Sequence, residues 1–224
     1  MLVVALGLGS FFSRQPDILR KEAPVPIQQK IIEWTPEFFN NPDAKGVMRE
    51  GNPRTIETPH GKAVSFDGVQ DGVFLDVNPI EHLAQFTIEV LFLPEPKAPP
   101  EQRFFHIGEV SGSRLLLETR VTPDDKWCLD AFIKSGDSSK TLIDGTLLHP
   151  TGQWARVAFV VDHGSMDTYV DGQHELSGRV AFAPFTEGKT SIGVRMNRVS
   201  WFKGSIAKIR ITPACLPPTD FMKE

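Results

Sequence analysis

Residues 126–134 read KWCLDAFIK, and this stretch decides the fold class. Successive side chains of a β-strand point to opposite faces, so one face here carries Trp127, Leu129, Ala131 and Ile133. The other face carries Cys128, Asp130, Phe132 and Lys134. A strand with one apolar face must bury that face against another layer, and two sheets that do so pack about 10 Å apart. The stretch therefore predicts a half-buried strand in a layered β-protein.

The neighbouring stretch 114–121, RLLLETRV, shows the same alternation. Leu115, Leu117 and Thr119 oppose Arg114, Leu116, Glu118 and Arg120. We expect the apolar set to enter the core and the polar set to face solvent or a concave groove. Arg114, Glu118 and Arg120 thus form a candidate ligand-binding face, because guanidinium groups bind carboxylates bidentately. A solvated Arg–Glu–Arg face is the simpler interpretation.

Short extended runs separated by turn residues continue along the chain. They lie at residues 30–34, 63–66, 73–77, 86–93, 103–110, 141–148, 154–162, 167–172, 179–185, 190–196 and 200–212. Residues 35–46 have room for one helical turn, and no segment after residue 60 sustains helical periodicity. The pattern predicts an all-β sandwich or barrel that forms one domain over residues 30–224.

The composition excludes some functional classes. A formal net charge of −4 argues against a general nucleic-acid binder. Residues 1–12 are an apolar run, shorter than the roughly 20 residues of a membrane-spanning helix. This signal-like start is followed by a proline-containing lead-in up to residue 29, and it predicts a secreted, periplasmic or cell-surface protein without a stable membrane span. Cys128 and Cys215 are either two buried thiols or, after export, a disulfide.

Four stretches in order resemble one known family. They are GKAVSFDG (61–68) followed by Asp71, FTIEV (86–90), WARVAFVVD (154–162) leading to YVDG (169–172), and Ile192-Gly193 followed by FKGSI (202–206) and IRI (209–211). Together they resemble the LamG-like domain of the concanavalin A-like lectin/glucanase superfamily over roughly residues 45–221. The resemblance implies a two-sheet antiparallel jelly-roll β-sandwich with Phe202 in the core and Trp154 in the core or at its rim.

The chain departs from this family at two positions. Ala207 and Lys208 stand where members often carry an acidic residue. Arg156 stands where members usually carry a histidine, and we expect that exchange to change only surface packing.

The resemblance implies a non-catalytic module that binds a carbohydrate or a protein surface. A polysaccharide-active enzyme, a glycoside hydrolase or a lyase, is the alternative on the same fold. Retaining hydrolysis needs two carboxyl groups about 5–5.5 Å apart, and no strand here carries paired acids two residues apart. His106 lies in an apolar strand and is expected to be a satisfied core or edge histidine. We therefore expect a binding domain rather than an enzyme.

Two further groups of residues are candidate sites. Trp201 beside Arg195, Asn197 and Arg198 could stack on a sugar or seat a peptide side chain. The resemblance also implies a calcium ion at the sandwich rim. Asp67 and Asp71 are the candidate ligands, with Asp162 and Asp171 at other turns. The alternative role of these aspartates is to cap their own turns.

Overall fold

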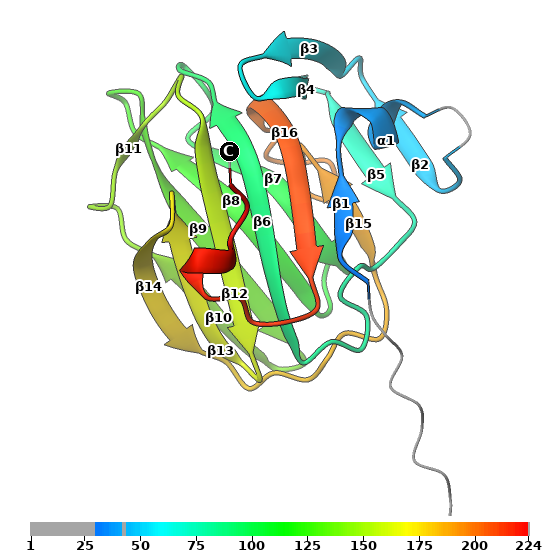
Figure 1. Cartoon of the computed structure of the whole chain (residues 1–224), viewed down its shortest axis with the longest axis vertical. Coiled ribbons are helices and arrows are strands. Elements are labelled where there is room, and N and C mark those ends of the chain that lie inside the picture. Colours follow the sequence, from blue (N-terminus) through cyan, green and yellow to red (C-terminus); the bar gives the residue numbers. More distant parts are fainter. Residues whose placement is uncertain (1–29, 42–43, 224) are drawn as a thin grey trace, which may run out of the picture.

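The computed structural model describes residues 30–41 and 44–223, so the predicted signal-like start and the lead-in lie outside the described residues. Two antiparallel eight-stranded sheets lie one behind the other (Figure 1). The predicted jelly-roll β-sandwich is confirmed.

One sheet, named sheet A, has the order β14-β13-β12-β6-β16-β4-β3, and β1 also pairs with β16. Its strands are β14 (Gln173–Arg179), β13 (Ser165–Val170), β12 (Ala155–Asp162), β6 (Gln85–Pro94), β16 (Lys203–Thr212), β4 (Gly61–Asp67), β3 (Arg54–Thr58) and β1 (Ile32–Trp34). The edge of β16 is shared, because Lys203–Ile206 pair with β4 while Ile209–Ile211 pair with β1.

The second sheet, named sheet B, has the order β10-β9-β8-β7-β15-β5-β2, and β11 also pairs with β9. Its strands are β10 (Ser138–Ile143), β9 (Lys126–Ser135), β8 (Arg114–Val121), β7 (Glu101–Gly108), β15 (Lys189–Ile192), β5 (Gly72–Leu75), β2 (Val47–Glu50) and β11 (His149–Pro150). A short helix α1 (Pro36–Asn40) fulfils the expectation of one helical turn, and a 3-10 turn η1 (Pro218–Asp220) lies near the C-terminus.

The core lies between the sheets and is rich in aromatic rings. Phe92 of sheet A packs against Phe104 of sheet B with ring centroids 4.6 Å apart, and against Trp127 at 5.2 Å. Phe202 is fully buried in the same cluster, as expected. The four residues assigned to the apolar face of 126–134 are all buried, so the alternation identified the core side of β9 correctly.

Two strand predictions need correction, and β2 and β3 were not expected. Residues 179–185 do not form a strand, because Ser135 Oγ binds both the N–H and the carbonyl of Ala183, and Pro184 lacks an N–H. The strand there is β14, which ends at Arg179. Likewise, the stretch 141–148 leaves the sheet after Ile143, where Asp144 caps a turn by accepting the N–H of Thr146. β2 and β3 were missed because few of their side chains are buried.

Both cysteines are free thiols, with Cys128 buried and Cys215 half-buried. Among the helices of the described part, none is long and apolar enough to cross a membrane.

Candidate functional site

A groove of about 710 Å³ lies on the outer face of sheet A, and we name it the sheet A groove. Leu91, Arg156 and Lys208 form its floor from β6, β12 and β16. The start of α1 and the β3–β4 turn form one side, with His60 in that turn. Trp154 lies directly before β12, and its ring meets the His60 ring at a centroid distance of 5.3 Å in an edge-on arrangement.

Strand alternation explains how the groove residues are presented. Trp154 and Arg156 line the groove, whereas Val157, the next residue, is fully buried in the core. The β12–β13 ladder fixes Arg156 further, because its backbone N–H donates to Asp171 Oδ1 at 2.8 Å and its carbonyl accepts the N–H of Asp171 at 2.7 Å. The backbone of Arg156 is thus held at the groove floor.

The C-terminal segment, residues 213–223, closes one end of the groove. It runs across the outer face of sheet A in front of β6 and β12 (Figure 1). Glu89 of β6 is fully buried beneath it, accepts from Arg210 Nε at 2.6 Å and also accepts the backbone N–H of Met222. Arg156 Nη1 donates to the carbonyl of Met222. These bonds fix the wall that Met222 adds to the groove.

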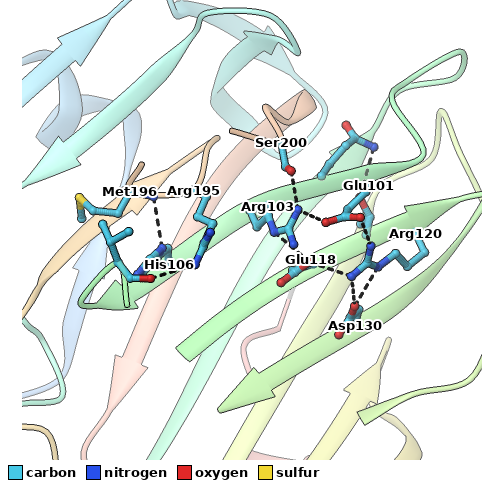
Figure 2. Close-up of polar contacts among 12 residues, drawn as sticks. Glu101, Arg103, His106, Glu118, Arg120, Asp130, Arg195, Met196 and Ser200 are labelled. Carbon is cyan, nitrogen blue, oxygen red and sulfur yellow. Dashed lines mark hydrogen bonds and ion pairs between the residues drawn. The ribbon is translucent and has the colours of Figure 1, made fainter. Parts of the chain in front are cut away.

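The predicted polar face of sheet B is a buried charge network, which corrects the expectation of a solvated surface (Figure 2). Glu118 is only 2% exposed. It lies 3.0 Å from Arg103 Nε and 3.2 Å from Arg120 Nη2, while Arg120 Nη2 also reaches Asp130 Oδ2 at 2.6 Å. Glu101 joins the network at its exposed edge through ion pairs with both arginines. Strand alternation predicted correctly which face of the sheet carries Glu118 and Arg120. The expectation that this face is exposed to solvent was wrong.

Burial changes the titration of the two inner acids. Loss of solvation, together with the neighbouring Asp130, raises the pKa of Glu118 to about 7 against the pull of Arg103 and Arg120. Burial also raises the pKa of Asp130. Arg114 lies apart from these acids, because it donates to the carbonyls of Ser111 and Gly112 and stacks over Phe132. The structure therefore brings Glu118 and Arg120 together and leaves Arg114 out.

His106 behaves as a satisfied core histidine, as expected. It is fully buried, its Nδ1 accepts the N–H of Met196 at 3.2 Å, and its Nε2 lies 3.3 Å from the Glu109 carbonyl (Figure 2). These partners require a neutral ring with the proton on Nε2. Burial, with added repulsion from Arg195, lowers the pKa of His106 to about 4.

The candidate residues around Trp201 are largely engaged with the protein itself. Arg198 forms a double hydrogen bond with Glu50 at 2.7 and 2.8 Å and covers the Phe74 ring. Arg195 Nη2 donates to the Val110 carbonyl at 2.9 Å. Trp201 is half-buried and Asn197 is exposed. Ligand binding at this rim stays a prediction.

The candidate calcium ligands bind backbone N–H groups. Asp67 Oδ1 accepts from Val69, Gln70 and Asp71, while Asp71 accepts from Asn52 through Oδ1 and from Asp67 through Oδ2. Within residues 30–41 and 44–223, no group of three His, Cys, Asp or Glu side chains is arranged to hold a metal ion. Calcium binding stays a prediction that these contacts do not favour.

The sequence interpretation missed the sheet A groove. Trp154 and Arg156 stand two residues apart at the start of a strand, a spacing that places both side chains on one face. That signal was available. Arg156 lines the groove floor, and the expectation that its exchange for histidine changes only surface packing stays a prediction. His60 and Lys208 could not be joined to the pair from the sequence, because they come from distant strands.

Solved structures share the fold at low sequence identity. Domain 4 of AbnA, an extracellular arabinanase from Geobacillus stearothermophilus in complex with arabinotriose, superposes with a TM-score of 0.58 at 24% identity, over 75% of this chain and 79% of that one. The binding domain of botulinum neurotoxin serotype G gives a TM-score of 0.58 at 10% identity, over 78% of this chain and 44% of that one. Tailspike protein 2 of an Escherichia coli O157:H7 bacteriophage gives 0.60 at 13% identity, over 79% and 26% of the two chains.

No curated protein matches the chain in sequence. A family model described as the concanavalin A-like lectin/glucanases superfamily, Laminin_G_3, matches residues 67–220. That match spans most of the sandwich, from the end of β4 to η1. The chain therefore belongs to the Laminin_G_3 family of the concanavalin A-like lectin/glucanase superfamily.

Proposed function

We propose that this domain is a non-catalytic module that binds a carbohydrate in the sheet A groove. The observation that carries the proposal is the half-buried ring of Trp154 beside the hydrogen-bonding side chains of His60, Arg156 and Lys208 in one groove. An aromatic ring packs on the apolar face of a sugar, and the polar groups bind its hydroxyls. The volume of about 710 Å³ falls within the range of small-ligand sites.

The acids of the groove favour binding over hydrolysis. Glycoside hydrolysis needs a carboxylic acid whose pKa is raised so that it can protonate the leaving oxygen. Hydrogen bonds from its own backbone N–H and from Thr35 instead lower the pKa of Glu37, and Asp171 Oδ1 is bound to the backbone of Arg156. Among the described residues, the two acids with a raised pKa are Glu118 and Asp130, and both lie on sheet B, in the other layer of the sandwich.

The similar structures support the proposal at the level of the fold. One of them is an arabinanase domain in complex with arabinotriose, and that arabinanase is extracellular. An extracytoplasmic location, which residues 1–12 predict, is part of the proposal.

A glycan array with the purified domain tests the proposal, and the best-binding glycan is then measured by calorimetry. Trp154→Ala should weaken its binding by at least about tenfold, which corresponds to about 1.4 kcal/mol. Trp201→Ala is the matched control, because it removes a half-buried tryptophan at the rim site expected from the sequence.

Three results would overturn the proposal. They are no bound glycan, binding that Trp201→Ala abolishes and Trp154→Ala spares, or release of reducing ends from a bound polysaccharide. The second result would move the site to the rim around Trp201, and the third would establish the enzyme alternative.

A further inference from the structure

The net charge of the sheet A groove is opposite in sign to the net charge of the whole chain. Among the described residues, four cations line it, namely Lys62, Arg156, Lys208 and Lys223, against two carboxylates, Glu37 and Asp171. The difference is +2, whereas the whole chain carries a formal charge of −4. Like-signed charges in a concave site attract ligands of the opposite sign.

Two of these cations have acidic partners. Lys62 lies 3.7 Å from Glu37, and Lys208 lies 3.8 Å from Glu33. All four of these side chains are 40–62% exposed, so each pair is solvated and weak.

Arg156 is a half-buried cation on the groove floor. Among the described residues it forms no ion pair within 4.0 Å, and its Nε is buried without a hydrogen-bond partner. Its Nη1 binds the Met222 carbonyl, which positions the group without neutralising it. Nε is closed off from solvent, so a ligand would meet the outer nitrogens of the guanidinium, which bind an oxyanion more strongly than they bind a neutral hydroxyl.

The spacing of Trp154 and Arg156 places both side chains on the same face of the chain. Residues two apart along an extended chain present side chains on one face about 6.5–7 Å apart. Both side chains line the groove, so one ligand can contact the indole and the guanidinium together.

We propose that the sheet A groove selects carboxylated glycans, with Arg156 binding the carboxylate of the sugar that stacks on Trp154. This inference rests on the proposed carbohydrate-binding function and adds the chemical class of the ligand.

The test compares a carboxylated glycan with its own methyl ester, which keeps the shape of the sugar and removes its charge. An array of neutral, carboxylated and sulfated glycans identifies the tightest carboxylated ligand of the wild-type domain. We expect that ligand to bind at least about tenfold more tightly than its methyl ester. Arg156→Gln should lose most of this preference, whereas Arg54→Gln should keep it, because Arg54 is an exposed arginine of β3 outside the groove.

The outcomes separate the two proposals. If only neutral or only sulfated glycans bind, or if acid and ester bind equally, the carboxylate inference is overturned while carbohydrate binding stands. If no glycan binds, both fail. A preference for the acid that survives in a folded Arg156→Gln protein overturns the role of Arg156. The wild-type comparison of acid and ester requires no variant, so it decides the ligand class even if Arg156→Gln unfolds.

Discussion

Glu118 and Asp130 are direct partners across the β8–β9 ladder, and both carboxylates are buried on the same face of sheet B. One guanidinium nitrogen, Arg120 Nη2, lies 3.2 Å from Glu118 Oε2 and 2.6 Å from Asp130 Oδ2 (Figure 2). Asp130 Oδ1 is buried and has no hydrogen-bond partner among the described residues. The network contains three carboxylates and two guanidinium groups, so one bound proton would balance its charge.

The first prediction concerns stability between pH 5 and pH 8. Because the pKa of Glu118 is about 7 in the folded chain against a usual 4.5, folding favours its protonated form. This contribution is fully present below pH 4.5 and is lost as the pH rises through 7. We expect the free energy of unfolding to fall by on the order of 2 kcal/mol between pH 5 and pH 8. Urea unfolding at the two pH values measures it.

Glu118→Gln should flatten this dependence, since the amide cannot ionise. Glu101→Gln is the control, because Glu101 belongs to the same network and its side chain is 46% exposed. Equal pH dependence in the wild type and Glu118→Gln would contradict the assignment.

The second prediction concerns His106 on the acid side. Its pKa of about 4 lies below the usual 6.5, so folding favours the neutral ring. The stability it contributes is present above pH 6.5 and decreases as the pH falls toward 4. An NMR titration should find its ring neutral at pH 5.5. A His106 midpoint near 6.5 would be inconsistent with the hydrogen bonds described above.

The third prediction concerns the wall of the sheet A groove. Glu89→Ala removes the acceptor for both Arg210 and the Met222 N–H and leaves a guanidinium with a side chain only 18% exposed unpaired. We expect a loss of roughly 3 kcal/mol in unfolding free energy. The control is Glu33→Ala, which breaks an exposed pair with Lys208 and should cost less than about 1 kcal/mol. A loss no larger than that of the control would show that Glu89 does not anchor the C-terminal segment.

The fourth prediction concerns calcium. Since Asp67 Oδ1 already caps three backbone N–H groups, Asp67→Ala should lower stability by about 1–2 kcal/mol. The loss should be the same in calcium and in EDTA, as measured by thermal unfolding. A wild-type melting temperature that rises with calcium, and a rise that Asp67→Ala removes, would instead establish the rim calcium site.

Sequence reasoning recovered the sandwich because local alternation carries the information about layers. Trp127, Leu129 and Ile133 had to face a core whatever packed against them, and they do. It failed at 179–185, where the backbone N–H and carbonyl of Ala183 form hydrogen bonds with Ser135 Oγ from another strand rather than with a neighbouring strand's backbone. Contacts of that kind depend on residues far away in the chain.

The candidate site was harder to predict for the same reason. The burial of Glu118 depends on Arg103 of β7, which pairs with it. The sheet A groove joins Trp154 to His60, which lies far away in the sequence. Only the shared face of Trp154 and Arg156 could be predicted from their spacing in the sequence. Alternation tells which side a residue faces, and it cannot tell what lies on top of that residue.

The alternation along β12 has a consequence for how this domain can diversify. One side of β12 packs in the core through Val157, Phe159 and Val161. Arg156, on the other side of the same strand, lines the groove. A substitution at position 156 therefore changes the groove floor and its bond to Met222 without removing a side chain from the core between the sheets. Residues that face the core and residues that face the groove thus alternate along one strand.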